Sequence, residues 1–508
     1  MKKFKRFACV ALSAIIALLC LSPAFAVTGG DSLTVSNPYA NVDWDTVNQF
    51  KTALHTHTNA SDGDPTLKQS IERHYETGFD IVATTDHGTV NYTWETPNEN
   101  KFIRAVLKLI GRSEGELEYL GRSGSFDNGA AYTYSKEGDD DYLSLADGRR
   151  IMRVPYGIEQ NAVSVNAHVN SWFVDFHNNS VTTYENAVRN VDRLGGVSVI
   201  NHPGEYSKAR YEIRSSEAYN EDTFAYKYFI NKVASLINRY DSCIGIDINS
   251  KGDGRTRFDR ILWDNLLERF ADNGENVFAI CSSDAHQLDK IDTGFIYALM
   301  PELNSASLRK SLESGCFFGA SHCIGNPDEL GQIAASLKEF YGEDELYSNV
   351  KAAYDEMQQR AVDIESGKLD ADDDLSVTYN VLDDRGYCTA QTQPMITSIS
   401  VDNAEAAVSI DTENALLVRW ISNGKLILTQ KADEARICLN DYKDSLGNYV
   451  RAEVFGEGGI VYTQAFLINA EANKGASDPV DPGFVDLGIF DFLLGIFMNW
   501  KEILGRMI

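Results

Sequence analysis

The stretch LHTHTNASDG, residues 54–63, places His55 and His57 one residue apart, with Asp62 five positions further on. In an extended strand, side chains two residues apart point to the same face, so both imidazoles can reach one ligand. The chain contains 9 histidines among 508 residues, and roughly 0.16 such HxH pairs would arise by chance. The motif alone is therefore weak, and its meaning depends on what the rest of the chain places beside it.

Histidines and carboxylates also follow other strand-like segments. Residues 50–320 alternate short β-branched runs with amphipathic helical stretches, which predicts an α/β fold with a parallel sheet, and seven such runs predict a barrel closed by helices. In a β/α barrel the carboxyl ends of the strands converge on one face. The candidate residues at these ends are His55 and His57, Asp86 and His87, Glu159, His168, His202, and Asp284 and His286.

The chemistry of these side chains points to a metal. Imidazole and carboxylate are the ligands of borderline divalent ions such as Zn²⁺, Mn²⁺ and Fe²⁺. One hydrogen-bonded histidine near a strand end is common, but that explanation does not account for six of the 9 histidines. The sequence therefore predicts a divalent metal site where the strands end.

The motifs LHTHTNASDG, TTDHG, GIE, AHVN, NHPG and SSDAH, in this order, resemble the PHP (polymerase and histidinol phosphatase) superfamily of metallohydrolases. The resemblance covers about residues 50–322. It is greatest with an exported, carbaryl-hydrolase-like branch, in which a barrel precedes a β-rich domain ending much like YVRAEVFGEGGIVYTQAFLI, residues 449–468. It implies a distorted (β/α)7 barrel with a cluster of two or three divalent ions, and hydrolysis by a hydroxide that bridges two of them.

The resemblance also implies a role for each candidate residue. The first ion would be held by His55, His57, Glu159 and Asp284, the second by the bridging Glu159 with His168 and His202, and the third by Asp62, His87 and His286. Glu159 and Asp284 would be catalytic, and Asp86 would assist by orienting a ligand. Ala53 departs from the pattern, because many relatives carry an acidic residue there.

The first 26 residues have the pattern of a secretory signal peptide. A basic start (Lys2, Lys3, Lys5, Arg6) precedes an apolar stretch, and Ala24-Phe25-Ala26 forms a small-x-small cleavage site. We expect cleavage after Ala26 and a secreted or cell-surface protein.

The sequence pattern divides the remaining chain into further segments. We expect the barrel over residues 27–325, with an insertion at about 95–148 that contains an acidic loop and lies over the barrel's mouth. Then follow a helical connector (326–370), an antiparallel β-sandwich (371–468), a linker (469–483) and an amphipathic helix (484–508).

Charge restricts the partners. Removing the 4 basic residues of the signal peptide takes the formal net charge from -28 to -32. Nucleic acid is bound mainly through Lys and Arg that displace counterions, so this balance argues against long nucleic acid. Lys208, Arg210, Arg255 and Arg257 follow strand ends, where they can either grip a substrate phosphate or form surface ion pairs.

Three functions fit the predicted site. The first is a metal-dependent phosphoesterase, because clustered dications activate water and neutralise an anionic ester. The second is a hydrolase of carbamates, carboxylic esters or amides, which uses the same metal site. The third is a non-catalytic surface binding protein stabilised by metal, which the large ligand set disfavours, because structural sites use fewer ligands.

The tail FVDLGIFDFLLGIFMNWKEILGRMI predicts an amphipathic helix for a membrane surface or a partner. Its apolar positions recur at three- and four-residue spacing. Asp491 and Lys501 leave only 9 uncharged residues in a row between them, well short of the roughly 20 that span a bilayer. Packing on the protein's own surface is the alternative.

Overall fold

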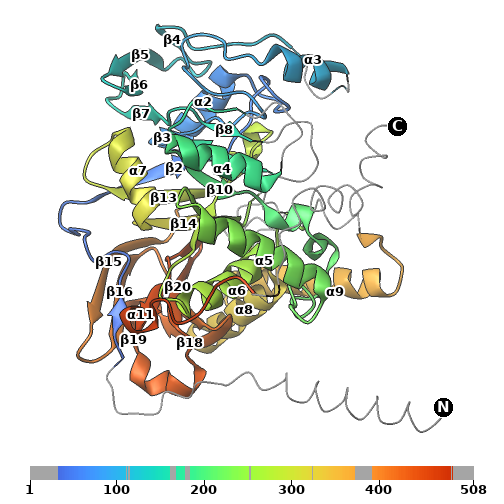
Figure 1. Ribbon diagram of the computed structural model, residues 1–508, viewed down its shortest axis with the longest axis vertical. Helices are drawn as coiled ribbons and strands as arrows, with labels where there is room; N and C mark the ends of the chain where they lie inside the picture. Colours follow the sequence, from blue (N-terminus) through green and yellow to red (C-terminus); the bar gives the residue numbers. More distant parts are fainter. Residues whose placement is uncertain are drawn as a thin grey trace.

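The computed structural model describes residues 33–109, 111, 115–160, 168–177, 183–250, 253–322, 324–371, 392–481 and 483. Within them, strands from both ends of the chain meet in one mixed sheet, and helices cover its flanks (Figure 1). The predicted C-terminal helix over residues 484–508 and the signal peptide lie outside the described residues. No helix in the described ranges is long and apolar enough to cross a membrane.

The helices follow the predicted amphipathic stretches and their end signals. Thr66 caps the first of them in a reciprocal box with Gln69, and Gly195 and Gly315 end two others in left-handed conformation, where glycine costs least. The helices are α2 (Leu67–Glu76), α3 (Lys101–Leu109), α4 (Tyr184–Leu194), α5 (Phe224–Arg239), α6 (Asp259–Ala271), α7 (Ser305–Ser314), α8 (Pro327–Tyr341), α9 (Glu345–Glu365) and α11 (Ala470–Asn473). Short 3₁₀ turns are η1 (Pro203–Tyr206), η2 (Lys208–Tyr211), η3 (Leu288–Lys290), η4 (Ala432–Glu434) and η5 (Leu439–Ser445).

A sheet of 14 strands runs through the molecule in the order β1-β22-β20-β21-β14-β13-β2-β3-β7-β6-β5-β4, with β17 and β18 branching from β20. Its strands are β1 (Val35–Ser36), β2 (Asn48–Ala53), β3 (Ile81–Val82), β4 (Ser123–Ser125), β5 (Ala131–Glu137), β6 (Asp140–Leu145), β7 (Arg150–Arg153), β13 (Gly294–Met300), β14 (Phe317–Ser321), β17 (Leu417–Ser422), β18 (Lys425–Lys431), β20 (Tyr449–Gly456), β21 (Gly459–Tyr462) and β22 (Phe466–Ile468). Only the β2-β3 and β3-β7 pairs are parallel in this sheet.

A second sheet carries the other predicted strand ends, in the order β12-β11-β10-β9-β8. Its strands are β8 (Ile158–Glu159), β9 (Val169–Trp172), β10 (Val197–Ile200), β11 (Cys243–Ile248) and β12 (Phe278–Cys281). β9 runs antiparallel to both neighbours, unlike the parallel order expected from the sequence, and His168, predicted near the end of a strand, directly precedes β9. Among the described residues the two sheets do not form a closed barrel, and the isolated bridges Thr56↔Ala285 and His87↔Glu159 connect segments of the two sheets.

The region around residues 123–145 differs from the predicted acidic loop. It forms β4, β5 and β6, which extend the sheet from β7 as an antiparallel meander. Tyr132 and Tyr134 are buried while Thr133 between them is exposed, the alternation of a half-buried strand. α3 contacts the HTHTNASDG segment, because Arg104 donates to the carbonyl of Asn59 at 2.5 Å.

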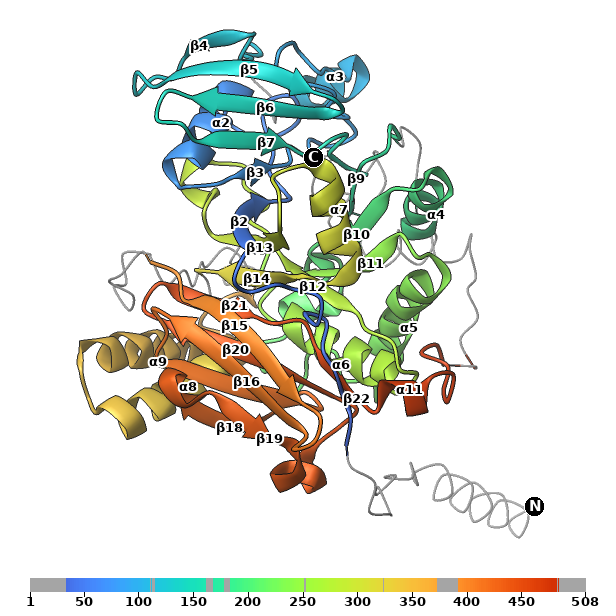
Figure 2. The same cartoon turned by 90° about the vertical axis from the view of Figure 1, so that its left-hand side faces the viewer.

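The C-terminal strands continue the same sheet instead of standing apart. β13 and β14, which the sequence patterns did not mark, carry the sheet from β2 to β21. A sheet of three strands, β15 (Met395–Asp402), β16 (Ala407–Glu413) and β19 (Arg436–Cys438), lies against these C-terminal strands (Figure 2) and shares a buried apolar cluster with them.

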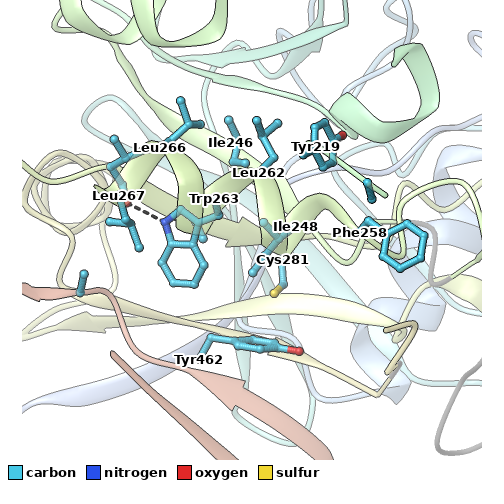
Figure 3. Packing of buried hydrophobic residues seen from close by; sticks show 14 of the residues in the cluster. Tyr219, Ile246, Ile248, Phe258, Leu262, Trp263, Leu266, Leu267, Cys281 and Tyr462 are labelled. Atoms are coloured by element: carbon cyan, nitrogen blue, oxygen red, sulfur yellow. Dashed lines mark hydrogen bonds between the residues drawn. The ribbon is translucent and has the colours of Figure 1, made fainter. Parts of the chain in front are cut away.

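Another apolar cluster joins the two halves of the chain. Trp263 on α6 lies at its centre, with Tyr462 of β21 below it (Figure 3). Beside it lie six charged side chains, of which Asp264, Glu329, Arg419, Arg451 and Glu453 are buried and Arg260 is nearly so. Glu453 accepts hydrogen bonds from Arg451 at 2.7 Å and from Arg260 at 2.8 Å, and it also accepts one from Arg419. Burial raises the pKa of Glu453, but the three guanidinium groups outweigh this and hold it well below its usual range.

Acid stability should depend on His74 of α2, which is buried and donates from Nδ1 to the Ser70 carbonyl at 2.7 Å. Burial lowers its pKa from 6.5 to about 4. The unfolded chain thus takes up this proton first, so the stability is present above pH 6.5 and is lost as the pH falls toward 4. His74→Gln should reduce the loss of unfolding free energy between pH 7 and pH 4 by up to about 3 kcal/mol. Urea titrations across that range measure it, and parallel curves for both proteins would contradict the assignment.

Candidate metal centre

Glu159, at the end of β8, lies at the centre of the predicted site. Its Oε1 is 2.8 Å from His168 Nδ1, 3.3 Å from His202 Nε2 and 3.6 Å from His55 Nε2. Its Oε2 is 2.8 Å from His87 Nδ1 and 3.4 Å from His57 Nε2. One buried carboxylate thus faces five imidazoles that come from four different segments of the chain.

Asp284, which follows β12, is a second buried carboxylate in the cluster. Its Oδ1 lies 3.0 Å from His57 Nε2 and 3.1 Å from His55 Nε2, and its Oδ2 lies 3.7 Å from His202 Nε2. Asp284 has a φ of 45° and His202 a φ of 26°, conformations that are rare outside glycine. Such strained backbone is typical of functional sites, where the surrounding structure holds it in place.

Asp62 is a third carboxylate of the cluster and lies close to three imidazoles. Its Oδ1 lies 3.4 Å from both His87 Nε2 and His286 Nε2, and 3.7 Å from His57 Nδ1. The segment that carries it turns back sharply, because the chain at Gly63 passes so close to His57 that a Cβ would lie 2.7 Å from the His57 carbonyl.

All nine predicted ligands therefore converge, because the two bridges Thr56↔Ala285 and His87↔Glu159 bring the strand ends together. Their donor atoms form four overlapping groups in which the atoms lie within 4.8 Å of one another. The groups are His57, Asp62, His87 and His286; His55, His57 and Glu159; His55, His202 and Asp284; and His87, Glu159 and His168. The overlap at His55, His57, His87 and Glu159 suits neighbouring ions that share ligands.

The cluster concentrates opposite charges in a buried place. Burial lowers the pKa of His55, but the carboxylates of Asp284 and Glu159 outweigh it and raise that pKa to about 10. Burial raises the pKa of Glu159, but the imidazoles of His168, His87 and His55 hold it well below its usual range. At His168 burial prevails and lowers the pKa to about 4. The Glu159 carboxylate is thus ionised at neutral pH and attracts cations.

Buried polar atoms of the cluster that lack a hydrogen bond also indicate that its residues fit a divalent ion. His87 Nδ1 and Glu159 Oε2, 2.8 Å apart, are buried and form no hydrogen bond of good geometry within the described residues. Buried polar atoms are nearly always satisfied, so a set concentrated in one cluster calls for an explanation. Coordination to divalent ions would satisfy such atoms, and it would also balance the carboxylate charge.

Asp86, the third predicted catalytic residue, hydrogen-bonds to the loop that follows His57. Its Oδ1 accepts from the Thr58 amide and the Ser61 hydroxyl, both at 2.7 Å, and its Oδ2 accepts from the Thr58 hydroxyl at 2.8 Å. Ser61 Oγ in turn lies 3.3 Å from His57 Nδ1. Asp86 thus acts on His57 through Ser61.

Several buried residues that contact the ligands were not predicted. Asn201 donates to Glu159 Oε1 at 2.8 Å, Glu205 Oε2 lies 3.4 Å from His202 Nδ1, and Asp247 Oδ2 lies 3.9 Å from His55 Nδ1. Asn201 precedes His202, and Asp247 lies at the end of the strand-like run GIDIN. Their place at strand ends could therefore have identified both residues, although asparagine and aspartate are common elsewhere in the chain.

The four candidate phosphate-binding cations are mostly engaged within the fold. Arg255 binds Asp253 at 2.5 Å and lies 3.7 Å from Glu205, Arg210 donates to the Glu205 carbonyl, and Arg257 donates to the Gly254 carbonyl. Lys208 is exposed.

The remaining histidines stand outside the cluster. His74 is a buried residue of α2, His177 is exposed, and His322 lies against the Gly458 carbonyl. Within the cluster, the side chain of His286 is 32% exposed, those of His87 and His168 are 14% exposed, and those of His55 and Glu159 are fully buried.

Comparisons with known proteins give weak likenesses. Neither a protein-family model nor a curated protein matches the chain. Among solved structures, a two-domain protein from Bacteroides vulgatus containing a predicted PHP-like metal-dependent phosphoesterase is 12% identical over 86% of this chain and 90% of its own, with a TM-score of 0.31. A lesion-specific endonuclease from Pyrococcus furiosus is 12% identical over 52% of this chain and 56% of its own, with a TM-score of 0.29. At these values neither likeness identifies the fold or the activity of this chain.

Proposed function

We propose that this chain is a metal-dependent hydrolase of the PHP superfamily, in its exported, carbaryl-hydrolase-like branch, and that its substrate is a phosphoester. The observation that carries the proposal is the Glu159 carboxylate with five imidazole nitrogens within 3.6 Å. The motifs that resemble the superfamily supply the same residues in the same order. The finer fold, a distorted (β/α)7 barrel, belongs to the same proposal.

The proposed ions are two or three of Zn²⁺, Mn²⁺ or Fe²⁺, because imidazole and carboxylate suit these metals. When bound, they would lower the pKa of a coordinated water and neutralise charge on the ester oxygens. The chain's own residues fix the ligand geometry: Asp86 holds the loop of His57, Asn201 holds Glu159, and Glu205 faces His202. An anionic ester would be drawn to this site in spite of the acidic surface.

The second candidate is a hydrolase of carbamates, carboxylic esters or amides, because polarising a carbonyl needs the same ions. A screen separates the two: the full mature chain, supplied with Zn²⁺, Mn²⁺ or Fe²⁺, is assayed on phosphomonoesters, phosphodiesters, aryl carboxylic esters and aryl carbamates. Faster turnover of a phosphoester supports the proposal, and turnover of the carbonyl esters alone contradicts it. Binding of metal with no turnover on any class favours a non-catalytic binding protein.

We also propose that the chain is secreted, with cleavage near Ala26, and that residues 484–508 bind a membrane surface as an amphipathic helix. Mature protein should float with phosphatidylcholine vesicles in a density gradient, and protein truncated after Gly483 should stay at the bottom. Under this proposal the tail does not pack on the described fold, so both forms should have the same thermal stability. Equal flotation of both forms would rule out membrane binding by the tail.

A further inference from the structure

Tyr206 lies beside two of the proposed ligands and has no role in the proposed function so far. It is the last residue of η1, the turn that follows His202. Its hydroxyl is 2.7 Å from His168 Nε2, and its ring centroid lies 4.6 Å from that of His168 and 5.6 Å from that of His202. The phenol therefore packs against both imidazoles on the side away from Glu159.

The two nitrogens of His168 face different partners. Nδ1 lies 2.8 Å from Glu159 Oε1, toward the centre of the cluster, and Nε2 faces the Tyr206 hydroxyl. A neutral imidazole carries one proton, and the hydrogen bond at one nitrogen decides which nitrogen keeps its lone pair. With its Nε2 proton donated to Tyr206, His168 presents the Nδ1 lone pair to an ion bound beside Glu159.

The turn that carries Tyr206 is itself held in place. A Cβ on Gly204 would lie 2.4 Å from Asp259 Oδ1, so the turn packs directly on α6 at a position that admits only glycine. Asp259 in turn accepts from the Tyr219 hydroxyl at 2.8 Å. The backbone of His202, Gly204 and Tyr206 is thus fixed against α6, which keeps the phenol at a constant distance from His168.

We propose that Tyr206 is a positioning residue that fixes the orientation and tautomer of His168, so that Nδ1 of His168 coordinates the ion it shares with Glu159. The inference rests on the proposed metal centre. Such outer partners of a ligating histidine typically change metal affinity by about 10- to 100-fold.

Tyr206→Phe in the full mature chain tests the inference, because it removes the hydroxyl and keeps the ring that packs on His168 and His202. The chain is stripped with a chelator and titrated with Zn²⁺ alone in competition with a coloured chelator. The Zn²⁺ affinity of one site should be about 10- to 100-fold lower than in the wild type, and the affinities of the other sites should be unchanged. The visible spectrum of the Co²⁺-loaded chain should change as well, which a purely structural role would not cause.

Tyr211→Phe is the matched control, because Tyr211 is on the neighbouring turn and its hydroxyl accepts from Arg210 at 2.7 Å. It should leave Zn²⁺ affinity and the Co²⁺ spectrum unchanged. In a His168→Ala background, Tyr206→Phe should cause no further loss, because both changes act through one ligand.

The outcomes separate the inference from the proposed function. Wild-type affinity and spectrum in Tyr206→Phe, or an equal loss of affinity when His168 is already absent, would overturn the inference alone. Failure of the wild-type chain to bind Zn²⁺ would overturn the proposed function and the inference with it.

Discussion

Glu159→Gln is expected to remove bound metal and hydrolysis together, with activity at least about 100-fold below the wild type, the upper end of the effect of outer-shell changes. Glu159 is fully buried and faces five imidazoles, so it supplies the negative charge that lets dications lie close to one another. Glutamine keeps the shape and loses that charge. Elemental analysis of the purified variant and its rate on the best substrate of the wild type measure both effects.

Two further variants make the Glu159 result specific. Asp284→Asn should lower metal content and cost at least about 10- to 100-fold in rate, because Asp284 Oδ1 lies 3.0 Å from His57 Nε2 and 3.1 Å from His55 Nε2. His74→Gln changes a buried histidine away from the cluster and should keep wild-type metal content and rate. Metal content and hydrolysis unchanged in Glu159→Gln would place the chemistry elsewhere in the chain.

Glu453→Gln should destabilise the fold by about 3 to 5 kcal/mol, the cost of breaking a buried ion pair on one side. Glu453 on β20 holds Arg260 of α6 and Arg419 of β17 as well as Arg451 on its own strand. All of these side chains are nearly or fully buried, so removing the carboxylate charge leaves cations with too little compensation. Urea unfolding followed by circular dichroism measures the change.

Glu313→Gln is the control for this prediction. Glu313 pairs with Arg309 one turn away on α7 at 2.8 Å, and both side chains are more than a third exposed. Exposed pairs of this kind contribute at most about 1 kcal/mol. If Glu453→Gln and Glu313→Gln were equally mild, the C-terminal strands would not depend on the buried charges that join them to α6.

Much of the site could be predicted because its ligands are rare residue types at recognisable places. His55, His87, His202 and Asp284 all follow apolar runs, and strand ends that converge bring such residues together. The structure places them in contact, while the metal roles stay a prediction. Tyr206 and Glu205 could not be selected in this way, because tyrosine and carboxylates are common on surfaces and only packing shows which of them contact a ligand.

The connections of the fold were harder to predict than its elements. The helices α2, α4, α6 and α7 lie within residues 50–320, where the sequence predicted amphipathic helical stretches between the strand-like runs. β13 and β14 pair with β2 and β21, segments far away in sequence, and a run such as FFGAS carries no sign of its partner. The direction of β9 was missed for the same reason, since the four residues VNSW carry no sign of the direction of their neighbours.

Metal content measured together with hydrolysis tests the central claim most directly. Mature protein purified without added chelator is analysed for Zn, Mn and Fe, then stripped, reloaded with each ion and assayed on a phosphoester. We predict at least two divalent ions per chain, loss of hydrolysis on stripping and its recovery on reloading. A chain that holds no divalent ion after reloading, or one that hydrolyses a phosphoester equally well when stripped, would contradict the proposal that Glu159 and its five histidines form a catalytic metal centre.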